Sequence, residues 1–109
     1  MIAFFRELRL SARLGKIQSN LMAGDYETAR EHLDIVLSAK PPEHIAVIAH
    51  CQRGEVEFYA GNFEAALESL EYCTRNAEVE PKAWEGEEWQ AKLIRAHKLR
   101  SKCLAKLSI

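Results

Sequence analysis

The amino-acid sequence predicts an all-α protein built from antiparallel helix–turn–helix repeats, and three observations lead to this fold class. A ten-residue motif occurs twice, as GDYETAREHL at 24–33 and as GNFEAALESL at 61–70, 37 positions later. Apolar residues make up 48% of the 109 residues and recur at helical spacing around each motif. Proline occurs only three times, which favours long helices over many short strands. A chain of this length fits one domain.

Each motif begins with a residue pair that suits the turn between two helices. Gly24 and Gly61 can adopt a left-handed backbone conformation, which ends the preceding helix at little cost. Asp25 and Asn62 follow them and are good N-caps, because their side chains accept hydrogen bonds from the free N–H groups of the next helix. We therefore expect one helix to end and another to begin at each motif.

The rest of the motif places small and large apolar residues where two helices would cross. Ala29 and Ala66 are small, as the closest approach of two antiparallel helices requires. Leu33 and Leu70 come four residues later, on the same helix face as those alanines. We expect both alanines to be buried at crossings inside their own repeats.

Periodicity and turn residues divide the chain into about five helices. The first has apolar residues at positions 10, 14, 17 and 21, and the second follows the first motif glycine. Pro42 suits the first turn of the third helix, and the fourth follows the second motif glycine. The fifth comes after Pro81 and has Trp89, Leu93 and Ala96 near one face. The expected ranges are 2–23, 25–39, 43–60, 62–77 and 83–107, with 77–88 as the expected loop.

These residues resemble the tetratricopeptide-repeat (TPR) family, whose unit of about 34 residues has glycine, then an aromatic residue, then alanine at fixed spacing. Repeat one would cover 10–43 and repeat two 47–80, and the helix 83–107 would cap them. The matching residues are Gly24, Tyr26, Ala29, Leu33 and Pro41 in the first, and Gly54, Gly61, Phe63, Ala66 and Leu70 in the second. The departures are Ile17 opposite Gly54, Cys73 at the late small position, and Glu78 in place of proline. The resemblance implies a TPR-like α-solenoid.

The resemblance also implies a function, because TPR proteins bind peptides in a concave groove lined by the first helix of each repeat. The corresponding positions in this chain are Leu14, Gln18, Cys51, Glu55, Phe58 and Tyr59. The subgroup that grips acidic C-termini of heat-shock chaperones has Lys and Asn at such positions, and this chain does not. We therefore expect an amphipathic helix or an extended apolar peptide of another protein as the partner. A scaffold, chaperone or assembly factor would work in this way.

A basic stripe on the last helix suggests a second type of contact. Its members are Arg95, Lys98, Lys102 and Lys106, whose spacing puts them on one helix face. They would contact an acidic partner, RNA or a membrane surface, or would simply be solvated. The chain as a whole has a net charge of −1, and no aromatic residues alternate with the stripe as base stacking would require. We expect neither nucleic acid nor membrane to be the main partner.

Four aromatic residues lie toward the two ends of the chain: Phe4, Phe5, Trp84 and Trp89. They would pack in the core and cap, or they would form an exposed apolar patch for self-association. Both interpretations stay open, so a homodimer is an alternative to a different protein partner.

The sequence contains no constellation that indicates an enzyme, a cofactor or a metal. His50 and Cys51 are adjacent, so on a helix they point about 100° apart and do not easily share a metal ion. No nucleophile is accompanied by a recognisable base, and no glycine-rich phosphate loop is present. Three cysteines without framework spacing favour a reducing compartment, and the start MIAFFREL lacks the apolar run of a signal peptide. We expect a cytoplasmic protein.

Overall fold

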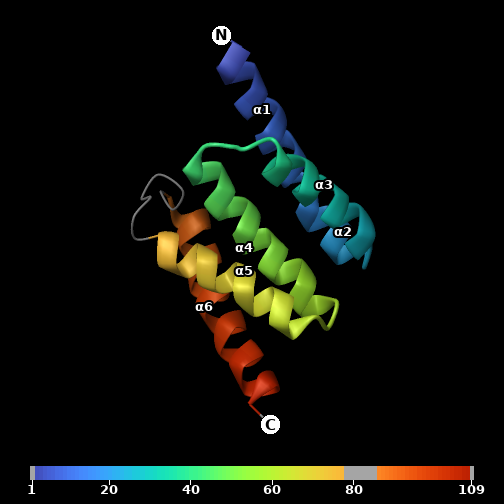
Figure 1. The fold of residues 1–109 in the computed structure, drawn as a ribbon, viewed down its shortest axis with the longest axis vertical. Coiled ribbons are helices and arrows are strands. Elements are labelled where there is room, and N and C mark those ends of the chain that lie inside the picture. The colour runs from blue at the N-terminus through green and yellow to red at the C-terminus, as the bar shows by residue number, and fades with distance from the viewer. Residues whose placement is uncertain (1, 78–85, 109) are drawn as a thin grey trace.

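The computed structural model describes residues 2–77 and 86–108, with side chains from residue 5 onward, and the regular structure in these ranges is entirely helical. The helices are α1 Ile2–Gly15, α2 Ile17–Met22, α3 Tyr26–Ser38, α4 Glu43–Tyr59, α5 Phe63–Asn76 and α6 Glu87–Leu107 (Figure 1). The all-α prediction is confirmed. The expected features at the Phe4 side chain, Glu78, Pro81, Trp84 and 83–85 lie outside the described residues.

The first expected helix, 2–23, is divided in two, which corrects the sequence prediction. The break falls at Lys16, whose backbone N–H donates to the carbonyl of Arg13 at 3.1 Å, a bond three residues back instead of four. Gly15 directly before the break favours it, because glycine is a poor helix former. A buried side chain from α4 supports the same point, since Gln52 Nε2 donates to the carbonyl oxygen of Leu14 at 3.1 Å.

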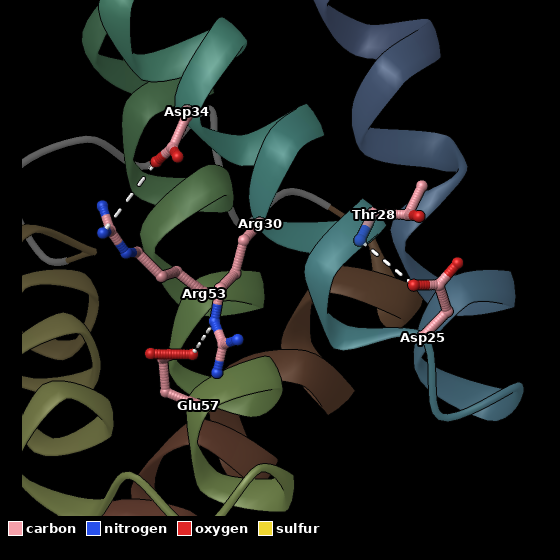
Figure 2. A network of polar contacts seen from close by, with 6 residues as sticks. All are labelled: Asp25, Thr28, Arg30, Asp34, Arg53 and Glu57. Atoms are coloured by element: carbon pink, nitrogen blue, oxygen red, sulfur yellow. Dashed lines mark hydrogen bonds and ion pairs between the residues drawn. The ribbon is translucent and has the colours of Figure 1, made fainter.

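The two motif turns have the expected backbone. Gly24 has a φ of 72° and Gly61 a φ of 87°, and each separates two helices. The side chain of Asp25 accepts a hydrogen bond from the Thr28 N–H at 3.2 Å, so this N-cap prediction is confirmed (Figure 2). Hydrogen bonding by the side chain and then the backbone of Thr28 also lowers the pKa of Asp25. Asn62 stands at the matching N-cap position with a similar backbone but makes no side-chain cap bond, so that part of the prediction is wrong.

Helix α4 is the centre of the molecule. It contributes to two groups of buried apolar residues, one shared with α1, α2 and α3 and the other with α5 and α6. Ala29 belongs to the first group and Ala66 to the second, and both are completely buried as predicted. Two ion pairs join α3 to α4, between Arg30 and Glu57 at 2.6 Å and between Arg53 and Asp34 at 4.0 Å (Figure 2).

Helix α6 packs against both α4 and α5 and completes the second core group with Ala96, Leu99 and Cys103. The molecule measures 50 × 30 × 23 Å. The first part of α1 and the last part of α6 extend beyond the other helices at opposite ends of the long axis (Figure 1).

The crossing of α4 and α5 generates a stability prediction. A Cβ atom on Gly54 would lie 2.5 Å from the side chain of the fully buried Leu70. Gly54→Ala should therefore lower the free energy of unfolding by about 1–2 kcal/mol, since overpacking outweighs the better helix propensity of alanine. Gly15→Ala is the control, because its Cβ would meet no atom within 4 Å. Urea unfolding followed by circular dichroism measures both, and equal stabilities would show that the crossing is not tight.

Candidate binding groove

A groove runs between α1–α2 on one side and α6 on the other, with α4 as its floor. Its volume is about 390 Å³. The lining residues come from four helices: Ser11, Leu14, Gly15, Gln18, Ile45, Ile48, Gln52, Glu88, Trp89 and Lys92. Apolar side chains with a few polar groups are typical of surfaces that bind a ligand or a peptide.

The floor of the groove is fixed to its first wall by Gln52. This side chain is 6% exposed and uses its Nε2 atom to hold the carbonyl of Leu14. Its Oε1 atom is buried and has no hydrogen-bond partner among the described residues. A buried amide oxygen without a hydrogen-bond partner costs free energy, and the bond that the same side chain donates to α1 offsets part of that cost.

The second wall is held by charges around Glu55. This carboxylate is 2% exposed, and its oxygens lie 3.9 Å from Lys92 Nζ and 3.7 Å from Arg95 Nε. Both distances exceed those of charge-assisted hydrogen bonds, so the attraction is mainly Coulombic. Lys92 Nζ also lies 5.7 Å from the ring centre of Trp89, and Arg95 Nη2 donates to the hydroxyl of Tyr59 at 3.0 Å. These contacts attach α6 to α4.

The six predicted groove residues separate into three pairs. Leu14 and Gln18 line the groove. Cys51 and Glu55 are buried beneath α6, in contact with the core and with its charges. The remaining two lie at the end of α4, where the half-buried Phe58 packs edge-on against the rings of Tyr59 and Phe63 and where Tyr59 is 44% exposed. The lining of this groove therefore includes neither Phe58 and Tyr59 nor Cys51 and Glu55.

Several lining residues were missed from the sequence. Ile48 and Gln52 are four residues apart on α4, so helical spacing alone would have placed them on one face. Glu88, Trp89 and Lys92 come from α6, and no sequence pattern indicated that this helix would form a wall.

The basic stripe of α6 is only partly open to a partner. Arg95 is engaged by Glu55 and Tyr59, and Lys106 lies 5.9 Å from the ring centre of Phe63. Lys98 and Lys102 are exposed. Two of the four stripe residues, Arg95 and Lys106, thus make contacts within the protein.

The three cysteines are free, buried thiols that belong to one core group. A hydrogen bond with Cys51, followed by burial, raises the pKa of Cys73, and burial raises the pKa of Cys103. The raised pKa values keep the Cys73 and Cys103 thiols protonated and poorly nucleophilic. Across 2–77 and 86–108, no three His, Cys, Asp or Glu side chains are grouped to hold a metal ion. None of the helices in these ranges combines the length and apolarity that crossing a bilayer requires.

Comparison with known proteins adds no relative. No family model matches the chain, and no curated protein and no solved structure matches it.

The charges between α4 and α6 generate a second stability prediction. Glu55→Gln should lower the free energy of unfolding by about 1–2 kcal/mol, less than for a fully buried pair because the Arg95 side chain is 48% exposed. Glu31→Gln on the exposed surface of α3 is the control and should change stability by less than about 0.5 kcal/mol. A double-mutant cycle with Lys92→Met, measured in urea, should give a favourable coupling energy. Additive effects of the two changes would show that the charges do not hold α6.

Proposed function

We propose that this chain is a TPR-like protein-interaction module that holds a peptide segment of a partner protein in the groove between α1–α2 and α6. The observation that carries the proposal is the groove itself, which two separate parts of the chain, α1–α2 and α6, build around the floor helix α4. Its apolar residues Leu14, Ile45, Ile48 and Trp89 offer a place for apolar side chains of the partner. Burial of such side chains is the main source of affinity at protein interfaces.

The arrangement of the helices supports the TPR-like interpretation. The α2–α3 and α4–α5 pairs share the same turn, with a left-handed glycine followed by an Asx residue at the N-cap. Helix α6 then lies against α4 and α5 where a capping helix is expected. In this interpretation the chain is a short α-solenoid of two repeats and a cap.

The chemistry of the groove supports binding and not catalysis. Its lining has one hydroxyl, on Ser11, and among the described lining residues no His or Cys stands beside it as a base or nucleophile. The proposal therefore gives the chain no catalytic role and no cofactor. A module of this kind would act as a chaperone or assembly factor that covers an apolar segment of its partner, in a reducing compartment such as the cytoplasm.

A blocking variant tests the proposal. Gly15 lines the groove, and a side chain added there would extend into open space, so Gly15→Phe should fill the groove without disturbing the fold. Linear peptides selected from a random display library on the wild-type protein serve as probes. Calorimetry should show Gly15→Phe weakening their binding by about tenfold or more, the loss typical of an interface anchor.

Two control variants decide between the groove and other surfaces. Glu31→Phe places the same ring on the exposed face of α3 and should leave peptide affinity unchanged. The double change Lys98→Gln and Lys102→Gln should lower the salt dependence of binding and keep most of the affinity. Loss of binding in the lysine variant alone would move the site to the basic face of α6. Light scattering that shows a dimer blocked by Gly15→Phe would make a second copy the occupant of the groove.

A further inference from the structure

The outward face of α1, turned away from the core, exposes large apolar side chains to solvent. Helical spacing places Phe5, Leu8 and Ala12 together on it, opposite the buried Leu10 and Ile17. Phe5 is 54% exposed and Leu8 is 56% exposed, and Ala12 is exposed as well. This face therefore offers apolar atoms to solvent along about 10 Å of helix, at 1.5 Å per residue.

On α6 the exposed Ile94 has Lys98 four residues later, which is the same offset that separates Phe5 from Arg9 on α1. A polar outer surface is what keeps a terminal helix soluble without a neighbour. On a helical wheel, Phe5, Leu8 and Ala12 fall within one sector of α1, and no charged residue of 5–12 falls within that sector. The α1 face therefore has the character of a surface that packs against another helix.

The charges beside this face indicate which kind of helix would fit. Of the basic residues of the first helical region, Arg6 donates to the Lys40 carbonyl at 3.0 Å and Arg13 lies 3.3 Å from a ring nitrogen of His32. Arg9 and Lys16 are exposed and form no ion pair with the described residues. Arg9 lies four residues from Phe5, on one flank of the apolar face, and Lys16 stands at the end of α1, two turns further along.

We infer that the face formed by Phe5, Leu8 and Ala12, with Arg9 on one flank and Lys16 at the end of α1, docks an amphipathic helix of a partner protein that carries Asp or Glu beside its apolar stripe. The apolar stripe of that helix covers Leu8 and Phe5, and its carboxylates pair with the two cations. Burial of the apolar side chains supplies most of the affinity, and the charges select an acidic helix over a basic one. A span from residue 5 to residue 16 corresponds to about three helical turns of the partner.

The test uses two synthetic helical peptides that differ only in charge. Both have the same stripe of leucine and alanine and the same covalent staple, and the stripe is flanked by Glu in one peptide and by Lys in the other. The acidic peptide should bind the full chain and shift the backbone amide NMR signals of residues 5–16. Its affinity should exceed that of the basic peptide by about tenfold or more at low salt, and the difference should shrink as salt is added.

Protein variants locate the contact and separate it from the groove. Leu8→Glu and Arg9→Glu should each weaken binding of the acidic peptide by about tenfold. The first change removes an apolar anchor and the second reverses a pairing charge. Lys98→Glu on α6 is the charge-matched control and should have no effect, and circular dichroism confirms that each variant is folded. Equal binding of the two peptides, shifts confined to the groove, or indifference to Leu8→Glu would each overturn the inference. Light scattering that shows a dimer lost in Leu8→Glu would assign the face to a second copy instead.

Discussion

The structure depends on the burial of α4 among all of its neighbours. Ten of its residues are buried, and they include three with polar side chains: Gln52, Glu55 and Glu57. Each of these reaches a different helix. Gln52 holds the Leu14 carbonyl of α1, Glu57 pairs with Arg30 of α3, and Glu55 attracts the cations of α6. A single helix thus supplies both the common core and the polar contacts that position the other helices.

This arrangement explains how the groove acquires a defined width. Its two walls are attached to the floor by Gln52 and Glu55, which are three residues apart on α4. Buried polar groups of this kind contribute little net stability, because desolvation offsets much of the attraction. Their contribution here is positional. Apolar packing alone would allow α1 and α6 to slide along α4, whereas the hydrogen bond from Gln52 and the ion pairs of Glu55 fix where each helix lies.

The sequence predicted the parts of the fold that rest on local backbone chemistry. The turns at Gly24 and Gly61 and the burial of Ala29 and Ala66 follow from residue types within one motif. The break at Lys16 has only one local signal, Gly15, and it also depends on the carbonyl of Leu14, whose hydrogen-bond partner lies 38 residues along the chain. The burial of Cys51 and Glu55 was missed for a similar reason. Their burial depends on where α6 lies, and α6 is held in place by Lys92 and Arg95, which pair with Glu55 on α4.

Charge is unevenly distributed along the sequence: residues 54–88 carry ten Glu, residues 89–109 carry six Lys or Arg and no acid, and residues 1–22 are also basic. Part of this charge is paired inside the fold. The acidic middle of the chain uses Glu55 and Glu57 to bind cations of α6 and α3, and Lys106 of the basic end lies over an aromatic ring. Lys92 faces Glu55, so Glu88 is the one lining residue among those described whose charge has no ion-pair partner, and recognition in the groove depends mainly on shape and apolar contact. Arg9 and Lys16 of the other basic end have no such internal role. Electrostatic steering of a partner would therefore act through these two cations and through the exposed Lys98 and Lys102 of the last helix.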